Sequence, residues 1–380
     1  MKIIYPYSMK LAKGYTYMLS IIQFLNELAK ECDVILVSLD TREEIKKYMA
    51  DILNIGISDR LIVQTINNRR FGIKSNKVFF RYELKKYISL FKDEELFIYT
   101  RDIKQMKYAI KMFLGKNNNI RFIFEAHQIL SQNYCRIGDY INAKKAIKSE
   151  KFVFNNVDYL FSITIPLKAE IKKIFKNHHV KNSVLPVGFD KRFLSVEQRK
   201  KKYDVIYSGN FSEWKGIDTL IKALRILKTN YSFSVSAILI GADNIQKKYY
   251  ERLCIENDVS DIVKIELRKE HKEIKELIAN SAIGVVPTKY NGDGALFTSP
   301  LKLYEYLGSG LKVVVSRLPP ITSAIPNELV YFFEPENPES LAKSILFAAK
   351  DKKFNKKNVR EFARNYTWEK RVENFLSFLR

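Results

Sequence analysis

The sequence predicts an α/β protein with two doubly wound domains, each built on a parallel β-sheet covered by helices. The chain has 380 residues, more than one ordinary domain holds. Several short runs, such as VILVSL, LFIYT and IGVV, are almost continuously apolar, which is typical of strands buried on both faces. Each run precedes a longer helical stretch, and this alternation indicates α/β architecture. Such sheets bind ligands beyond the carboxyl ends of their strands.

The first half contains seven predicted strands. They are Lys2–Tyr5, Asp33–Leu39, Leu61–Thr65, Leu96–Thr100, Arg121–Glu125, Tyr159–Ile163 and Ser183–Val187. Each is short and rich in β-branched or aromatic residues, as strands are. The stretches between them have the helical character that parallel connections require.

The pattern restarts after a charged stretch, Val196–Tyr203 (VEQRKKKY), which we interpret as a linker. Six more strands are predicted: Tyr203–Ser208, Phe233–Ile240, Ile262–Glu266, Ala282–Pro287, Lys312–Ser316 and Leu329–Phe333. The last helix, Thr367–Leu379, has apolar residues at helical spacing, namely Trp368, Val372, Phe375, Leu376 and Leu379. We expect domains at residues 1–195 and 196–365, followed by a terminal helix at 366–380.

The chain is strongly basic, with 65 Lys and Arg against 42 Asp and Glu, a net charge of +23. A field of this sign attracts anions. Phosphorylated metabolites, anionic lipids and nucleic acid are therefore candidate partners, although a solvated lysine-rich surface explains the same excess.

Cysteine usage and hydropathy indicate a cytoplasmic protein. Cys32, Cys135 and Cys254 are far apart and form no CxxC pair, which argues against a disulfide framework or a zinc site. A reducing compartment is the natural setting for such a chain. The N-terminus lacks a signal-peptide apolar region, and no run reaches the roughly 18 apolar residues of a membrane span.

The most informative stretch is Val286–Pro319, VPTKYNGDGALFTSPLKLYEYLGSGLKVVVSRLP. A strand ends at Pro287, and we expect Thr298 or Ser299 to cap a helix that starts at Pro300. The glycines at 308 and 310 would end that helix.

The start of this predicted helix has the features of a phosphate site. Free N–H groups at a helix N-terminus bind anions, and Lys302 adds a full positive charge there. Glu305 lies one turn further on, where a carboxylate accepts both hydroxyls of a ribose. The alternative is a capped core helix in which Lys302 and Glu305 only form an i,i+3 pair.

A second stretch, Tyr207–Leu224 (YSGNFSEWKGIDTLIKAL), carries Lys215 at the mouth between a strand and a helix. Lys215 is positioned there to pair with a diphosphate, or is a surface lysine.

Together these stretches resemble the C-terminal domain of the retaining glycosyltransferases of family four, the glycosyl transferases group 1. The loop from Gly209 to Lys215-Gly216 resembles the family's Gly-x5-Lys-Gly loop, whose lysine binds the donor diphosphate. The segment around Glu305, YEYLGSG, resembles its EAMAxG segment, whose Glu binds the donor ribose. Leu185–Phe193 resembles its interdomain PNGVD…F segment, and the Trp368 helix resembles the helix that crosses back to the first domain.

The resemblance implies the GT-B fold, with two Rossmann-like domains whose parallel sheets face a cleft. The first domain would bind the acceptor and the second the nucleotide-sugar. Leu267 and Arg268 lie where family members contact the nucleotide base. Thr298 and Ser299 belong to the expected phosphate-binding helix start.

The N-terminal half matches the family less closely. Gly14, after Lys13, lies where a glycine-rich loop faces the donor phosphates, and a simple turn is the alternative. The segment FEAH resembles the strand-end E-x-H segment, so His127 is expected near the donor sugar rather than in a structural role. Tyr99–Asp102 lines the acceptor side or forms a loop salt bridge.

The chain departs from the family pattern at several positions. The first of the family's two glutamates falls on Phe297, as in a subgroup that lacks it, and Asp293 is a candidate replacement. The usual arginine of the diphosphate clamp is Asn210, for which Lys302 compensates, and the Asn of PNGVD is Val187.

The resemblance implies a metal-independent hexosyltransferase that uses a UDP- or GDP-linked sugar and no separate cofactor. His127, Lys215 and Glu305 are the expected catalytic groups: the first positions the sugar, and Lys215, with the helix start and Lys302, stabilises the departing diphosphate. The leaving phosphate would act as the base. No DxD pair or cluster with metal-ligand spacing is present. The acceptor would be a saccharide or a lipid-linked saccharide in bacterial surface glycan assembly.

Three alternatives stay open at this point. The chain is another nucleotide-sugar enzyme of the same fold, such as a hydrolysing epimerase, a non-catalytic transferase homologue, or a nucleic-acid-binding protein. We expect no nucleic-acid partner, because no helix-turn-helix, zinc-finger, RNP or KH signature occurs.

Two basic segments are candidates for contact with an anionic membrane at its inner face. In Asn67–Lys92, eight Lys and Arg residues interleave with aromatic ones, and we favour membrane or lipid contact. In Leu167–Lys181, an apolar face carries Leu167, Ile171, Ile174 and Phe175. There we favour packing of that face on the sheet, which is common in α/β folds.

Overall fold

The computed structural model describes residues 1–380 except 12–15, 67–68, 71–72, 75–76, 92, 116–118, 177–178 and 291–296. The described chain divides into two compact units, Met1–Pro186 with Arg371–Arg380, and Val187–Lys370. The boundary therefore falls between Pro186 and Val187, earlier than the 195/196 of the sequence-based expectation. The chain returns to the first unit at Arg371, inside the final helix, rather than at 366.

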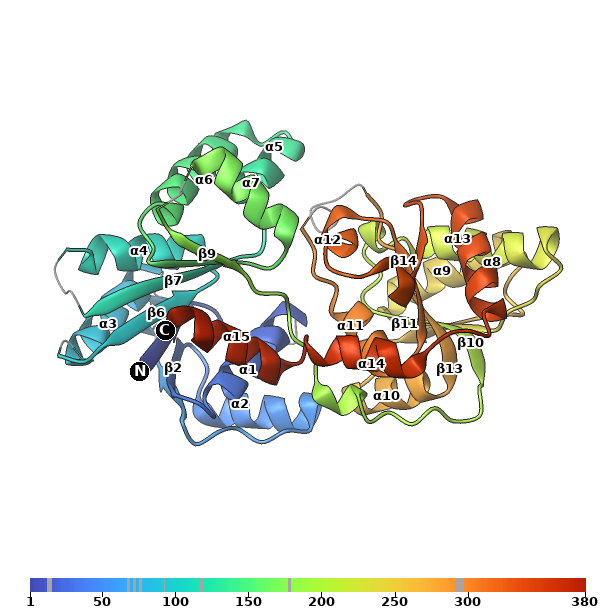
Figure 1. The fold of residues 1–380 in the computed structure, drawn as a ribbon. Helices are drawn as coiled ribbons and strands as arrows, with labels where there is room; N and C mark the ends of the chain where they lie inside the picture. The colour runs from blue at the N-terminus through green and yellow to red at the C-terminus, as the bar shows by residue number, and fades with distance from the viewer. Residues whose placement is uncertain are drawn as a thin grey trace. The chain divides into compact units, whose positions relative to one another are not determined.

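The first unit is built on a seven-stranded sheet of order β3-β2-β1-β6-β7-β8-β9, in which every pair of neighbouring strands is parallel. Its strands are β1 (Lys2–Pro6), β2 (Asp33–Ser38), β3 (Leu61–Thr65), β6 (Leu96–Thr100), β7 (Ile120–Ala126), β8 (Tyr159–Ser162) and β9 (Lys181–Val184). Its helices are α1 (Thr16–Leu28), α2 (Arg42–Tyr48), α3 (Lys77–Ile88), α4 (Ile103–Phe113), α5 (Leu130–Arg136), α6 (Tyr140–Phe154) and α7 (Ile165–Phe175) (Figure 1). The helix α15 (Trp368–Leu379) joins this unit from Arg371 onwards.

The second unit has a six-stranded parallel sheet of order β12-β11-β10-β13-β14-β15. Its strands are β10 (Tyr203–Ser208), β11 (Ala237–Ala242), β12 (Val263–Leu267), β13 (Ser281–Val286), β14 (Lys312–Ser316) and β15 (Tyr331–Phe333). Its helices are α8 (Ile217–Asn230), α9 (Asn244–Glu256), α10 (His271–Ala279), α11 (Leu301–Gly308), α12 (Pro319–Thr322), α13 (Pro338–Lys350) and α14 (Lys356–Arg364). Two parallel-sheet α/β domains with Rossmann-like order confirm the predicted fold class.

All thirteen predicted strands are present, with ends that differ by a few residues. The antiparallel pair β4 (Arg69–Arg70) and β5 (Ile73–Lys74) was not predicted, because two-residue strands carry no periodic signal.

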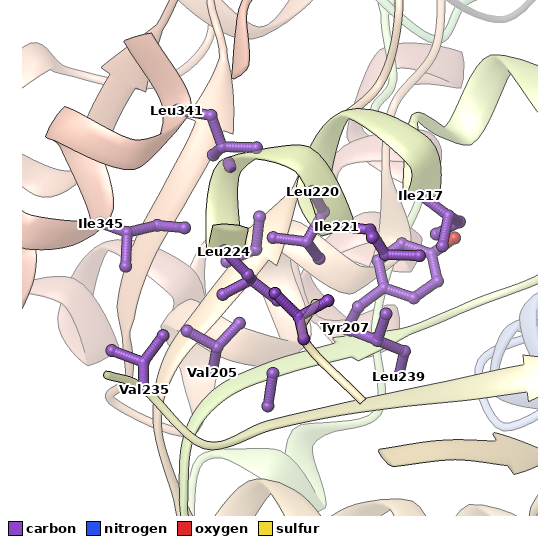
Figure 2. Close-up of a cluster of buried hydrophobic side chains, with 14 of the residues drawn as sticks. Val205, Tyr207, Ile217, Leu220, Ile221, Leu224, Val235, Leu239, Leu341 and Ile345 are labelled. Carbon is purple, nitrogen blue, oxygen red and sulfur yellow. The ribbon is translucent and has the colours of Figure 1, made fainter. Parts of the chain in front are cut away.

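Strand β10 shows why the sheet of the second unit needs helices on both faces. Successive strand side chains point to opposite faces. Val205 and Tyr207 are buried with α8 and α13 in one cluster, while Ile206 is buried with α10 and α11 in another. Figure 2 shows the first cluster, with side chains of Leu220 and Leu224 over the sheet. Each fully buried side chain of this size contributes about 1.5–3 kcal/mol.

In the first unit, the aromatic ring of Phe375 on α15 packs at the centre of the core. Its ring centroid lies 5.4 Å from that of Phe24 on α1, 5.2 Å from Tyr99 on β6 and 5.1 Å from Phe161 on β8. Edge-on and offset contacts at these distances add to the free energy of burial. The C-terminal segment is therefore part of this core.

The two basic segments have different outcomes. The apolar face of α7 is inside the first unit, since Leu167, Ile171 and Phe175 are buried, as we favoured. Of Asn67–Lys92, part lies outside the described residues; within α3, Phe80, Leu84 and Ile88 are buried. No helix in the described part of the chain is long and apolar enough to cross a membrane.

Candidate functional site

The order of the second sheet fixes where a ligand site should be. Strands β10 and β13 are neighbours at the centre of the sheet, and the chain leaves them in opposite directions, from β10 to β11 on one side and from β13 to β14 on the other. A crevice forms beyond the carboxyl ends of the strands at such a switch point. The loops that follow β10 and β13 carry Lys215 and the residues 287–300, respectively.

These two loops contact each other through their backbones. The Lys289 amide donates to the Trp214 carbonyl over 2.9 Å, and the Lys289 ammonium lies 3.0 Å from the Asp218 carboxylate. Gly216 has a φ of +71°, and a Cβ at this position would lie 1.9 Å from the Pro287 carbonyl oxygen. Glycine is therefore required there for both its backbone conformation and its size.

Lys215 ends the short helix Glu213–Lys215, and its ammonium lies 3.7 Å from the centre of the Trp214 ring. Burial, reinforced by the nearby positive charge of Lys302, lowers the pKa of Lys215 to about 8. Among the residues that the structure describes, no carboxylate forms an ion pair with it. Lys302 is paired with Glu305, whereas the charge of Lys215 is not compensated by a carboxylate among the described residues. The two lysines together therefore attract an anion.

Lys302 and Glu305 form the pair that the sequence allowed. The Lys302 ammonium lies 2.6 Å from the Glu305 carboxylate, whose side chain is 2% exposed. Burial raises the pKa of Glu305, and Lys302 opposes that effect by favouring the ionised form. A buried carboxylate with remaining acceptor capacity suits the hydroxyl groups of a ribose.

The start of α11 differs from the prediction. The helix begins at Leu301 with Pro300 as its N-cap residue, so Thr298 and Ser299 do not cap it. The Ser299 hydroxyl instead accepts a hydrogen bond from the Val187 amide at 3.3 Å and also bonds Tyr304. That hydroxyl is thus used elsewhere. The helix ends at Gly308, and Gly310 has a φ of +73°, as expected.

Three residues that the sequence analysis did not select lie in the same cluster. His271 Nδ1 is 3.8 Å and Lys275 Nζ 3.4 Å from the Asp190 carboxylate, which also binds Arg192. Burial, followed by the charge of Lys302, lowers the pKa of His271 to about 3, so its ring is neutral. Asp190 lies in the PNGVD-like segment, so the sequence could have indicated it. Nothing in the sequence indicated His271 and Lys275, since only tertiary packing brings α10 to the site.

The other predicted residues of this unit have varied surroundings. Phe297 is buried. Asn210 is exposed, and its side-chain oxygen accepts a hydrogen bond from the Ser212 amide in the same loop. The Gly209 amide donates to the Ile240 carbonyl. Leu267 and Arg268 are exposed at the end of β12. Asp293, like Gly14 of the first unit, lies outside the described residues.

In the first unit, His127 follows β7 and its Nε2 lies 2.6 Å from the carboxylate of Glu125. Arg101 Nε is 3.0 Å and Arg371 Nη2 2.8 Å from the same oxygen. Of the two interpretations of Tyr99–Asp102, the structure has the salt bridge: Arg101 pairs with Glu125, and Asp102 caps α4. Glu125 and Arg371 were not selected from the sequence, although Glu125 stands in the FEAH segment.

The described residues include no group of three or more His, Cys, Asp or Glu side chains arranged to hold a metal ion.

Comparison with known proteins gives the same type of fold at low sequence identity. HepE from Anabaena, solved in complex with UDP, superposes with a TM-score of 0.72 at 14% identity, covering 100% of this chain and 99% of that one. Sucrose-phosphate synthase from Thermosynechococcus elongatus gives a TM-score of 0.74 at 16% identity, covering 100% and 98%. TarM from S. aureus gives 0.71 at 13% identity, covering 100% and 99%. These likenesses support the GT-B fold.

A family model provides the assignment. The model described as "Glycosyl transferases group 1" matches residues 168–366, just over half of the chain and nearly all of the second unit. No curated protein matches the chain. The protein is therefore a glycosyltransferase that belongs to the glycosyl transferases group 1 family.

Proposed function

We propose that the protein transfers a hexose from a UDP- or GDP-linked donor to a saccharide or lipid-linked saccharide, with retention and without a metal ion or a separate cofactor. The observation that carries the proposal is the cluster of Lys215, Lys302 and buried Glu305 beyond β10 and β13. Two cations suit a diphosphate, and a carboxylate beside them suits a ribose. HepE solved with UDP-glucose and TarM solved with UDP support this donor class.

In this proposal the protein acts on the departing diphosphate. Lys215 and Lys302 stabilise the negative charge that develops on it, which is the kind of preorganised electrostatic effect that accounts for much of enzymatic rate enhancement. Glu305 orients the ribose, and Leu267 with Arg268 contacts the base. The leaving phosphate takes the proton of the acceptor hydroxyl.

The loop residues complete the proposed donor site. Gly209 and Asn210 follow β10, and Phe297, Thr298 and Ser299 precede α11, so in this proposal all five line the donor site. Asp293 and Gly14 stay predictions from the sequence, since both lie outside the described residues. The absence of the first family glutamate at Phe297 is consistent with a subgroup that binds its donor sugar differently.

The test is thermal stability with UDP, GDP, ADP and CMP and their sugar derivatives. A ligand at 100 times its Kd that binds only the folded protein stabilises it by about 2.7 kcal/mol. We expect a shift with UDP or GDP compounds that is lost in Glu305→Gln. Glu361→Gln, which removes a surface carboxylate also paired at i,i+3, is the matched control.

Turnover then separates the enzyme classes. A retained anomeric configuration in the product, in the presence of EDTA, supports the full proposal. Donor turnover without acceptor would indicate a hydrolase or an epimerase. No shift with any nucleotide, together with salt-sensitive oligonucleotide binding, would contradict the transferase proposal.

For the acceptor, we propose a role in bacterial surface glycan assembly on the cytoplasmic side of a membrane. The junction of α5 and α6 supports contact with an anionic lipid surface. Ile137, Tyr140 and Ile141 are 70%, 66% and 71% exposed there. The exposed residues that follow on α6 include Lys144, Lys145, Lys148 and Lys151. Exposed apolar groups beside lysines match the interface of such a membrane.

A further inference from the structure

The Glu125 carboxylate, at the end of β7, is fully buried in the first unit and binds four side chains. Oε1 lies 2.6 Å from His127 Nε2, 2.8 Å from Arg371 Nη2 and 3.0 Å from Arg101 Nε. The Tyr99 hydroxyl donates to Oε2. One carboxylate therefore faces two guanidinium groups and one imidazole.

The charges of this cluster determine the protonation state of His127. Burial alone would raise the pKa of Glu125, but Arg101 and Arg371 outweigh it and hold that pKa well below its usual range. Burial and Arg101 lower the pKa of His127, and the hydrogen bond to Glu125 only partly opposes them. The two arginines already compensate the carboxylate, so the imidazole stays neutral. Tyr5 and Tyr99, the other titratable groups beside Arg101, have raised pKa values and are also neutral.

A neutral imidazole has one donor and one acceptor nitrogen. An ionised carboxylate only accepts hydrogen bonds, so the nitrogen that faces Glu125, Nε2, carries the proton. Nδ1 is then the acceptor. None of the residues that the structure describes forms a hydrogen bond with Nδ1, and the side chain is 32% exposed.

We propose that Glu125 is a positioning residue that holds His127 as the Nε2–H tautomer, so that Nδ1 accepts a hydrogen bond from a ligand hydroxyl. The positive charges of Arg101 and Arg371 favour this neutral state over the imidazolium. The site thus selects a hydroxyl donor and does not bind a phosphate, because a neutral acceptor nitrogen offers nothing to an anion. The identification of the hydroxyl as part of a sugar rests on the proposed function. The assignment of the tautomer is independent of that function.

The tautomer can be read directly by long-range ¹H–¹⁵N NMR of protein labelled at histidine. The chain has four histidines, so His127→Gln identifies the signals of His127, and His179→Gln must leave them in place. We expect the Nε2–H tautomer at pH 8 and a titration below the ordinary histidine value of about 6.5. An Nδ1–H tautomer at pH 8, or a titration above the ordinary value of about 6.5, would overturn the proposal.

Two variants test the cause. Arg371→Gln removes one of the charges that lower the pKa of His127, so its titration should move to higher pH. Glu125→Gln replaces an acceptor by a group that also donates, and should populate the Nδ1–H form. If neither variant folds, Tyr99→Phe, which removes only the hydrogen bond to Oε2, should keep the Nε2–H form, and loss of that form would contradict the proposed role of Oε1.

Turnover of UDP-glucose, or of the donor found by the thermal panel, adds a functional readout. The amide oxygen of His127→Asn can replace Nδ1 as acceptor, whereas the longer side chain of His127→Gln cannot reach the same point. We expect His127→Gln to lose about tenfold more in kcat/KM than His127→Asn, the value of one hydrogen bond. Equal losses would contradict the role of Nδ1. Absence of any turnover, with the NMR result intact, would count against the proposed function alone.

Discussion

Arg371 on α15 donates a hydrogen bond over 2.8 Å to Glu125, a residue 246 positions earlier at the end of β7. Both side chains are almost completely buried, at 1% and 0% exposure. Arg371 Nε also donates to the Pro186 carbonyl at 2.7 Å. The C-terminal helix is thus held to the first sheet by a buried ion pair as well as by the ring of Phe375.

Arg371→Met should strongly destabilise the first unit. Arg101 still pairs with the Glu125 carboxylate, but the substitution removes the second guanidinium group and its charge-assisted hydrogen bond, which costs about 1.5–3 kcal/mol. Urea unfolding monitored by circular dichroism measures the loss. Asn374→Ala, at an exposed position of the same helix, should change the free energy of unfolding little. A loss in Arg371→Met no larger than in this control would show that the pair contributes nothing.

The same pair predicts acid sensitivity. The folded-state pKa of Glu125 lies well below its unfolded value of about 4.3, so its contribution is fully present above that pH. It is lost as pH falls through about 4.3 towards the folded pKa. Unfolding free energies at pH 7, 4 and 3 should fall more steeply for the wild type than for Arg371→Met. Parallel curves would be inconsistent with a lowered pKa at Glu125.

Nucleotide affinity should depend on the charge of Lys215. Its pKa of about 8 in the free protein means that the ammonium is present at pH 7 and lost as pH rises above 8. Calorimetric Kd values for UDP or GDP should then increase by up to about tenfold per pH unit, the slope for one proton. Lys215→Arg should remove this dependence, because a guanidinium stays charged. Lys222→Ala, at an exposed position of α8, is the control, and an unchanged Kd up to pH 9.5 in the wild type would contradict the prediction.

Gly216→Ala should damage the loop that carries Lys215 through two separable effects. A left-handed φ costs an L-residue about 1 kcal/mol, and the clash with the Pro287 carbonyl adds to it. Gly115 has a similar φ of +73° with nothing within 4 Å, and Gly56 has neither feature among the described atoms. We expect the loss in melting temperature to rank Gly216→Ala, then Gly115→Ala, then Gly56→Ala. Equal melting temperatures for the first two would show that the loop accommodates the methyl group.

The α5–α6 junction should bind anionic vesicles. Replacing Ile137, Tyr140 and Ile141 together by serine removes the apolar groups and leaves the lysines of α6 in place. Flotation with vesicles containing phosphatidylglycerol should fall several-fold, and nucleotide-induced stabilisation should not change. Ile245→Ser on α9, an 82% exposed isoleucine of the second unit, is the matched control. Equal flotation of the triple variant and the wild type would exclude this surface.

Much of the architecture could be predicted because short stretches of the sequence are enough to identify its strands and loops. Parallel strands buried on both faces are continuous apolar runs, such as the one at β14, and need no partner information to be recognised. The glycine at 216 and the lysine before it could be assigned to a strand-to-helix loop for the same reason. The start of α11 could not be predicted in this way, because the Ser299 hydroxyl that would cap the helix accepts a hydrogen bond from the Val187 amide instead. The helix-capping propensity of a serine does not show that a distant amide competes for its hydroxyl.

By itself, the sequence determined the two α/β domains, the order of their strands along the chain and the loops that carry Lys215, Lys302, Glu305 and His127. Tertiary structure alone decided which charges these residues meet. Asp190, His271 and Lys275 reach the Glu305 cluster, and Arg371 reaches Glu125, only when distant segments pack together. The physical reason is that a pKa depends on burial and on charges within a few ångströms, whatever their separation along the chain.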